Sequence, residues 1–74
     1  MRRPPLTLRR KRFLAELRAY PGEWLDMANL WLTQVGQHLN TVEIRDAIHA
    51  LCALGYAEAN GTDTAWRYTE QSNA

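Results

Sequence analysis

The cations are the residues of this chain whose type and spacing could do chemistry. Residues 1–18 hold seven Lys or Arg side chains against one carboxylate, a net charge of +6, whereas residues 19–74 hold two against seven carboxylates, a net charge of −5. The total of +1 hides this division. Guanidinium and ammonium groups gathered at one end of a chain attract phosphate oxygens, so the distribution favours a nucleic-acid partner.

The first group of cations lies in residues 1–5, where Arg2 and Arg3 precede Pro4 and Pro5. Two consecutive prolines exclude a helix and keep the preceding residues extended. We therefore expect residues 1–5 to form a flexible basic arm, of the kind that enters a narrow minor groove.

The second group fills four consecutive positions: Arg9, Arg10, Lys11 and Arg12. They fall in the first turns of a predicted helix, where the positive end of the helix dipole disfavours each exposed cation by up to about 0.3–1 kcal/mol. A phosphate would reverse this effect, because backbone N–H groups and cations then converge on one anion. We expect these side chains to contact nucleic acid, and the alternative is a solubilising, disordered tail.

Side chains that could build a catalytic or metal site are few. His49 and Cys52 are three positions apart and His38 precedes them, but structural zinc needs four nitrogen or sulfur ligands and the chain has one cysteine. The only serine is Ser72, and no glycine-rich phosphate loop occurs. We expect no catalytic residue, no metal and no cofactor, so the sequence does not predict an enzyme. Cys52 is expected to be a small buried hydrophobe.

Length and composition limit the architecture. Seventy-four residues with 46% hydrophobic and 23% charged side chains suit one small folded domain, which we place at residues 6–69 before a flexible tail at 70–74. A single cysteine allows no internal disulfide, which fits a reducing compartment such as the cytoplasm. No apolar run approaches the ~18 residues that span a bilayer, so we expect no membrane partner.

Apolar periodicity predicts three helices. The first helix is predicted at residues 8–20, with Thr7 as its N-cap. The second is predicted to begin after the N-cap Asp26 and to end at Gly36. The third is predicted to begin at a capping box of Asn40 and Glu43 and to end at Gly55. The faces predicted to be buried are Phe13, Leu14, Leu17 and Tyr20 in the first helix, Met27, Leu30, Trp31 and Val35 in the second, and Ile44, Ala47, Ile48, Leu51 and Leu54 in the third.

The period then changes to that of strands. Residues 56–59 and 65–69 are predicted to form a β-hairpin around the loop 60–64. A two-residue turn would set Glu58 opposite Asp63, a like-charge pair. We therefore favour a four-residue loop that sets Ala57 opposite Trp66.

The three tryptophans are expected to anchor the core. Large aromatic side chains supply much of the buried area in so small a domain. Trp31 is expected to be the most exposed of the three.

The order of three helices followed by a hairpin resembles the winged helix-turn-helix family over residues 6–69. The segments that carry the resemblance are GEWLDMANL (22–30), LNTVEIRDAIHAL (39–51), LGYAE (54–58) and WRYT (66–69). The resemblance implies a small, mainly α, α+β fold: a three-helix winged helix with a C-terminal β-hairpin wing. Trp24 would belong to a very short third strand against the hairpin.

The resemblance also implies a function. In this family the third helix enters the major groove of double-stranded DNA, while the wing and the start of the first helix touch backbone phosphates. Transferred to this chain, the DNA contacts would be Asn40, Thr41, Arg45 and His49 on the third helix and Arg67 on the wing. The chain would be a transcriptional regulator or nucleoprotein accessory factor, similar to those of phages, plasmids and bacteria. A homodimer or a cooperative partner is implied, because a small monomer binds weakly.

The charge of the third helix leaves a second function open. Base-reading helices usually present Arg, Lys, Asn or Gln. The outward positions of this helix are instead Val42, Glu43, Asp46, His49, Ala50 and Ala53, with Arg45 at the boundary. The alternative is therefore a winged-helix protein–protein interaction module whose weakly charged third helix contacts a second copy or another protein.

Overall fold

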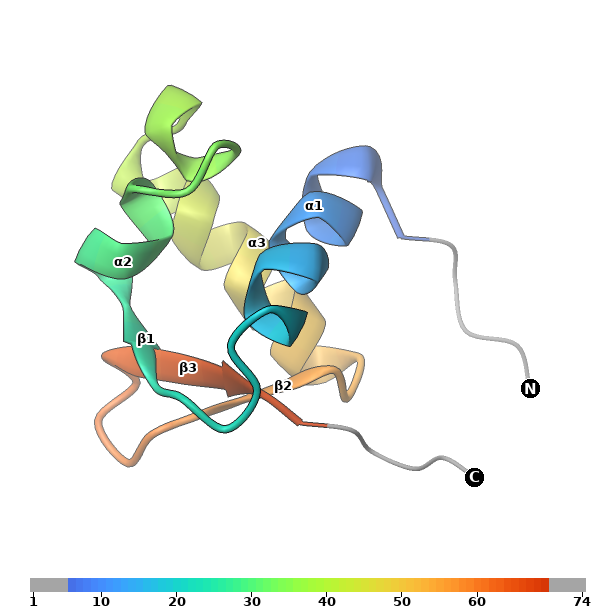
Figure 1. Ribbon diagram of the computed structural model, residues 1–74, viewed down its shortest axis with the longest axis vertical. Helices are drawn as coiled ribbons and strands as arrows, with labels where there is room; N and C mark the ends of the chain where they lie inside the picture. The colour runs from blue at the N-terminus through green and yellow to red at the C-terminus, as the bar shows by residue number, and fades with distance from the viewer. Residues whose placement is uncertain (1–5, 70–74) are drawn as a thin grey trace.

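The computed structural model describes residues 6–69, and the expectations for the arm at 1–5 and the tail at 70–74 lie outside this range. The elements in chain order are α1 (Leu8–Arg18), β1 (Leu25–Asp26), α2 (Met27–Trp31), the 3₁₀ helix η1 (Gly36–His38), α3 (Thr41–Ala53), β2 (Ala57–Ala59) and β3 (Ala65–Tyr68). Three α-helices pack with a three-stranded antiparallel sheet (Figure 1). The predicted small α+β class is confirmed, and the arrangement is compatible with a winged helix.

Helix α1 begins as predicted and ends two residues early. The Thr7 hydroxyl accepts the Arg10 N–H at 3.2 Å and caps the helix. The buried residues of α1 are Phe13, Leu14 and Leu17. The predicted extension to Tyr20 is wrong, because the chain turns after Arg18 toward Gly22, which adopts a φ of +80°. Tyr20 is therefore exposed and not part of the core.

Helix α2 is shorter than predicted. It starts at the predicted Asp26 cap but ends at Trp31 rather than at Gly36. The Thr33 hydroxyl donates to the Leu30 carbonyl at 2.6 Å and accepts the Gly36 N–H at 2.9 Å. This side chain thus provides local hydrogen bonds that compete with continuation of the helix.

Gly36 was predicted to end the second helix, but its role in the structure is to let its backbone pack closely against that of Leu30. A Cβ at this position would lie 1.9 Å from the Leu30 carbonyl oxygen, so only glycine lets the two backbones approach. Gly55, by contrast, has a φ of +90° and follows the end of α3, as predicted. The tight turn at Gly36 fixes how the chain leaves α2 and enters α3.

Helix α3 follows its prediction closely. Asn40 Oδ1 accepts the Glu43 N–H at 2.8 Å, and Glu43 Oε1 accepts the Asn40 N–H at 3.0 Å. This is the predicted capping box. The buried residues of α3 are Ile44, Ala47, Ile48 and Leu51. Leu54 is half-buried at the C-cap.

The sheet has the strand order β1-β3-β2. The expected short third strand is present and pairs with β3, but it is formed by Leu25–Asp26 and does not include Trp24. The four-residue hairpin loop is confirmed, because the Asn60 N–H donates to the Ala65 carbonyl at 2.9 Å across residues 61–64.

The predicted hairpin register is wrong by two residues. Ala59, not Ala57, lies opposite Trp66. The cause is Asn60, whose side-chain oxygen accepts the N–H groups of Thr64 and Ala65 and so makes Asn60 the residue that closes the loop. Because strand side chains alternate with a period of two, the same faces still meet.

The core lies where α1, α2, α3 and the sheet meet. Its members are Phe13, Leu14, Leu17, Leu30, Ile44, Ala47, Ile48, Leu51, Ala57 and Trp66. Trp66 is a core anchor as predicted, and Trp31 is 50% exposed, the highest of the three tryptophans, also as predicted. The prediction of a core Trp24 is wrong, since this side chain is 43% exposed, and the prediction that Trp31 belongs to a buried face of α2 is wrong for the same reason. No helix within residues 6–69 is long and apolar enough to cross a lipid bilayer.

Candidate nucleic-acid interface

The start of α1 carries four consecutive cations, and within the described residues only Arg9 has an ion-pair partner. Arg9 Nη2 lies 3.8 Å from Glu43 Oε2 of α3. Within residues 6–69, Arg10, Lys11 and Arg12 have no ion-pair partner. The first turn of α1 holds no acidic residue either. Positive side chains are therefore concentrated at a helix end that already has a partial positive charge.

These cations surround the start of α1 instead of forming one stripe, because successive residues of an α-helix differ in direction by about 100°. Arg9 and Arg10 line an open groove against α3, which Asp46 lines from the other side. Arg12 lines a second groove with His38, beside the connection from α2 to α3. The cluster thus flanks the first half of α3 and the turn before it.

Two predicted DNA contacts lie at the start of α3. The Asn40 side-chain oxygen is engaged by the capping box, so this atom serves the helix. Thr41 is exposed in the first turn. Its hydroxyl is available to an anion that approaches the N-terminal end of α3.

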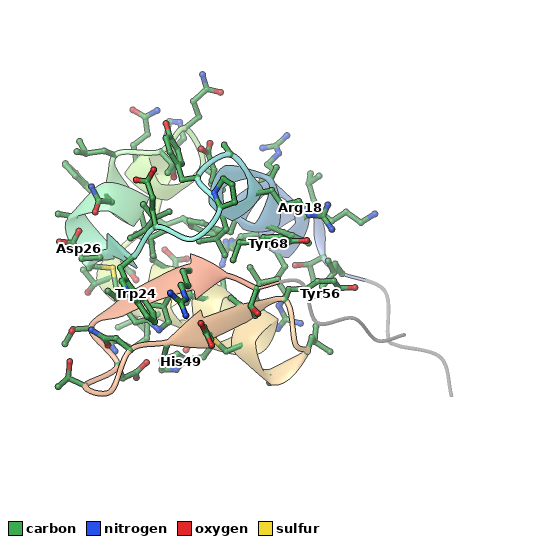
Figure 2. All side chains as sticks on the ribbon, turned by 60° about the horizontal axis from the view of Figure 1, so that its bottom comes forward. Arg18, Trp24, Asp26, His49, Tyr56 and Tyr68 are labelled. Atoms are coloured by element: carbon green, nitrogen blue, oxygen red, sulfur yellow. The ribbon has the colours of Figure 1, made fainter. Side chains whose placement is uncertain are left out.

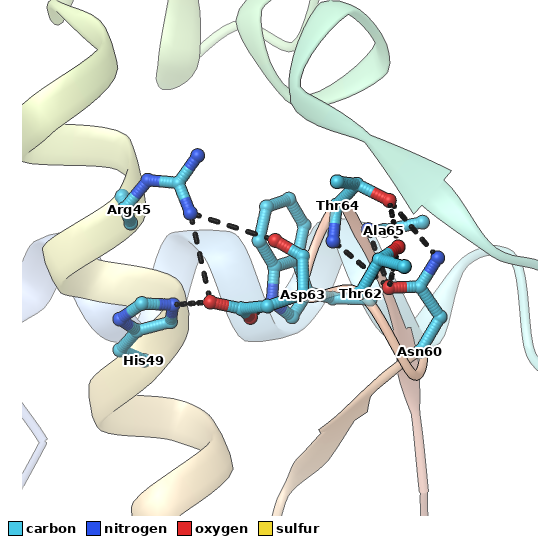
Figure 3. A network of polar contacts seen from close by, with 8 residues as sticks. Arg45, His49, Asn60, Thr62, Asp63, Thr64 and Ala65 are labelled. Carbon is cyan, nitrogen blue, oxygen red and sulfur yellow. Dashed lines mark hydrogen bonds and ion pairs between the residues drawn. The ribbon is translucent and has the colours of Figure 1, made fainter.

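The other two predicted α3 contacts meet the hairpin loop, residues 61–64 (Figure 3). Asp63 Oδ2 accepts a hydrogen bond from His49 Nε2 at 2.9 Å and lies 3.6 Å from Arg45 Nη1. Arg45 Nη1 also reaches the Asp63 carbonyl oxygen at 3.5 Å. The second carboxylate oxygen, Oδ1, accepts the Trp66 indole N–H at 2.9 Å. One carboxylate therefore joins the loop, the sheet and α3.

Both α3 side chains also lie against the Trp66 ring. The Arg45 guanidinium carbon is 5.7 Å from the ring centroid, and the His49 ring meets the indole edge-on at 6.3 Å. Such contacts hold a cation and an imidazole in place without neutralising them. Arg45 and His49 are thus oriented by Trp66 as well as by Asp63.

The electrostatic surroundings of Asp63 favour its charged form. The hydrogen bond from Trp66 is the main cause that lowers the pKa of Asp63, and His49 and Arg45 lower this pKa further. Asp63 adopts a φ of +56°, a left-handed conformation that Asp and Asn tolerate better than most residues. The carboxylate is therefore held as an anion beside α3.

The predicted wing contact, Arg67, lies on the other face of the sheet. It follows the buried Trp66, and successive strand residues point to opposite faces. Its guanidinium forms an ion pair with Glu58 on β2 and stacks over the Trp24 ring at 4.4 Å from the centroid. Trp24 is labelled beside the sheet in Figure 2. Arg67 is therefore engaged within the sheet and is not aligned with the α3 contacts.

The outward face of α3 is weakly charged, as predicted. Val42 is 66% exposed, and Asp46 and Ala53 are also exposed. The predicted outward positions Glu43 and Ala50 are half-buried at the edges of this face. This face of α3 therefore offers an apolar surface and one carboxylate, Asp46, that has no ion-pair partner within the described residues. The α1 cations lie on one side of the face and the hairpin loop on the other.

The structure thus divides the predicted site into three parts. The first is the group of cations around the start of α1, and the second is Arg45 and His49 beside the hairpin loop. The third is Arg67 on the other face of the sheet. Sequence reasoning missed the partners Asp63, Glu58 and Trp24. A signal existed for Glu58, because a four-residue loop with Asn60 as its closing residue sets it opposite Arg67. Arg2 and Arg3 lie outside the described residues.

Cys52 packs against the core but is half-buried, not fully buried as predicted. Burial raises the pKa of its thiol, and the carboxylates of Asp63 and Glu58 raise this pKa further. Thiolate is therefore disfavoured at this position. Among residues 6–69, no group of three or more His, Cys, Asp or Glu side chains is placed to hold a metal ion.

Comparisons with known proteins found no relative. No family model matches the chain, and no curated protein or solved structure is significantly similar to it. The functional argument therefore depends on the geometry and charges described above.

Proposed function

We propose that this chain binds double-stranded DNA as a winged-helix protein, with the start of α1 on the phosphate backbone and α3 directed toward the major groove. The observation that carries the proposal is the set of three cations, Arg10, Lys11 and Arg12, that have no ion-pair partner within residues 6–69. They stand in the first turns of α1, where Arg10 lines a groove against α3 and Arg12 lines a groove with His38. A phosphate backbone supplies the anions that this placement lacks.

Three of the four other Lys or Arg side chains within residues 6–69 are paired with carboxylates, and Arg18 lies over the Tyr68 ring instead. Arg9, Arg45 and Arg67 each face a carboxylate of the same chain, so their net attraction for DNA is reduced. The start of α1 then supplies most of the electrostatic attraction, together with Arg2 and Arg3 of the N-terminal arm. The outward face of α3 contributes shape and the Thr41 hydroxyl more than charge. Such a protein acts as a transcriptional regulator or a nucleoprotein accessory factor.

The first test is a titration of random-sequence duplex DNA at several salt concentrations. For each phosphate contact, log K falls with log[salt] by about 0.9. We expect Lys11→Gln and Arg12→Gln each to weaken binding and to reduce this slope by about one. The matched control is Arg18→Gln, which removes the same charge at the other end of α1, where Arg18 packs over Tyr68 at 5.6 Å (Figure 2).

Three outcomes would contradict the proposal or its site. If the wild-type chain does not bind duplex DNA at low salt, the DNA function is wrong. If Arg18→Gln weakens binding as much as Lys11→Gln, the attraction is diffuse and the α1 site is wrong. If the change of Arg9, Arg10, Lys11 and Arg12 together to Gln leaves binding intact, the site is equally wrong.

The second candidate is a protein–protein interaction module that uses α3. The observation that favours it is the outward face itself, where Val42 is 66% exposed and Arg45 and His49 already face Asp63. NMR chemical-shift mapping separates the two candidates. Shifts at residues 8–12 and 41–49 on addition of duplex DNA support DNA binding. Concentration-dependent shifts at Val42 and Ala53 without DNA support self-association through α3.

A further inference from the structure

The hairpin loop, residues 61–64, presents the carboxylate of Asp63 where we would expect a DNA-binding surface to present a cation. Asp63 points from the loop toward α3 and contacts Arg45 and His49, two of the four DNA contacts predicted for this helix (Figure 3). We propose that Asp63 occupies, in the free protein, the position that a DNA phosphate takes in the complex, and so masks Arg45 and His49 until DNA displaces it. This inference rests on the proposed DNA-binding function.

The geometry fits an anion that can be exchanged. Carboxylate and phosphate oxygens accept hydrogen bonds from the same cationic donors. Of the two carboxylate oxygens, Oδ2 faces the α3 pair, at 2.9 Å from His49 Nε2 and 3.6 Å from Arg45 Nη1. The Asp63 carbonyl oxygen also lies 3.5 Å from Arg45 Nη1. The other carboxylate oxygen, Oδ1, is anchored by the Trp66 indole N–H at 2.9 Å. A phosphate that takes this position must displace the whole carboxylate, so Asp63 gives up its Trp66 hydrogen bond together with its α3 contacts.

The contacts that must open are accessible to solvent. The side chains of Arg45, His49 and Asp63 are 44–46% exposed. Ion pairs this exposed contribute little in water, because both partners remain hydrated. The Trp66 ring still supports the Arg45 guanidinium and the His49 imidazole after release, so both groups stay oriented for an incoming phosphate.

The loop does not need the Asp63 carboxylate to close. The Asn60 N–H donates to the Ala65 carbonyl at 2.9 Å, and Asn60 Oδ1 accepts the Thr64 N–H at 2.8 Å. The Thr62 and Thr64 hydroxyls lie 2.8 Å apart and complete the network. Because this closure is independent of α3, the contacts of Asp63 with Arg45 and His49 add a link between loop and helix and are not required to form the turn.

The test substitution is Asp63→Asn. Its amide oxygen can still accept the Trp66 N–H, and Asn tolerates the left-handed backbone at this position, so the fold is retained. The change removes the charge that opposes Arg45. We expect affinity for a random-sequence duplex to rise about 1.5- to fivefold, in keeping with the strength of an exposed ion pair. The salt slope should steepen by about one contact.

Each of two control variants removes one negative charge at a position other than Asp63. Glu23→Gln alters a groove between α1 and α2 on residues remote from Asp63 in the contacts described. Glu58→Gln releases Arg67 on the opposite sheet face. Both should raise affinity less than Asp63→Asn does. The gain from Asp63→Asn should also disappear in the double variant with Arg45→Gln, because the released group is then missing.

The outcomes separate the two proposals. If the wild-type chain binds duplex DNA but Asp63→Asn binds equally or more weakly while its NMR spectrum stays native, only the masking role is wrong. If Glu23→Gln gives the same gain, the effect is one of net charge and the masking role is again wrong. If neither the wild-type chain nor Asp63→Asn binds at low salt, both proposals are wrong.

Discussion

At the scale of single residues, Asp63 is the group through which the hairpin loop contacts both α3 and Trp66. Its carboxylate accepts from Trp66 and His49 and faces Arg45, and its backbone is held in a left-handed conformation. Each donor stabilises the ionised form, and Trp66 has the largest effect on the lowered pKa. Protonation of this one group should therefore weaken several contacts together.

This pKa gives a pH dependence with a defined sign. A carboxyl whose pKa is lower in the folded chain contributes stability above its unfolded pKa, and that contribution is lost as the pH falls through the folded value. The ordinary value is 3.8, so the loss occurs below about pH 4. We expect wild-type thermal stability to fall more than that of Asp63→Asn between about pH 6 and about pH 2.

Thermal unfolding of both chains at each pH measures this difference. The Trp66 indole N–H resonance gives a local readout, because its hydrogen-bond acceptor changes on protonation. Equal losses of stability in the two chains, with no movement of this resonance below pH 4, would show that Asp63 is not coupled to the fold as described.

At the scale of elements, the connection between α2 and α3 depends on the close approach of Gly36 to Leu30. A Cβ at Gly36 would lie 1.9 Å from the Leu30 carbonyl oxygen. The same connection carries η1 and His38, which line the groove beside Arg12. A side chain at Gly36 must therefore move backbone that also positions α3.

We expect Gly36→Ala to destabilise the domain by about 1–3 kcal/mol, the usual range for an overpacked site. Gly61→Ala is the matched control, because no atom lies within 4 Å of a Cβ placed there. Urea unfolding followed by far-UV circular dichroism measures both free energies of unfolding. A Gly36→Ala chain as stable as the wild type would disprove the close approach.

Several elements were predictable because their signals are local. The Asn40–Glu43 capping box and the apolar spacing of α3 both operate within a few residues, and both were confirmed. The end of α2 was not predictable in this way, since it depends on the Thr33 hydroxyl and on backbone packing at Gly36. The hairpin loop length was predicted, but its register required knowing that the Asn60 side chain closes the loop.

The candidate site was less predictable than the fold. Charge counting located the cations at the start of α1, which are exposed apart from the half-buried Arg10. It could not show that Arg45 and His49 face Asp63, because these contacts join residues 14 and 18 positions apart through the tertiary structure. A list of cations in a sequence therefore overestimates the charge that a partner meets.

At the scale of the whole molecule, one core joins every helix to the sheet. Its members come from α1, α2, α3, β2 and β3. A domain this small buries only about 60% of its unfolded surface. Loss of one large core side chain should therefore affect the whole chain rather than one element.

We expect Phe13→Ala to lower the free energy of unfolding by about 3–5 kcal/mol. This is a large part of the about 5–15 kcal/mol that is typical of a folded domain. Phe13 is fully buried, so the substitution leaves a cavity between α1 and the rest of the core. Leu8→Ala is the control, because Leu8 lies on the same helix and is 63% exposed. Hydrogen exchange should accelerate across all elements in Phe13→Ala. Acceleration confined to α1 would contradict a shared core.

The unpaired cations at the start of α1 also have a kinetic consequence. Residues 6–69 hold seven Lys or Arg and seven Asp or Glu side chains, so this part of the chain is nearly neutral yet has a positive pole. Under the proposed DNA binding, we expect such a molecule to rotate in the field of the duplex before contact, so that its positive pole leads. Added salt should then slow the association of the two molecules far more than it speeds their separation.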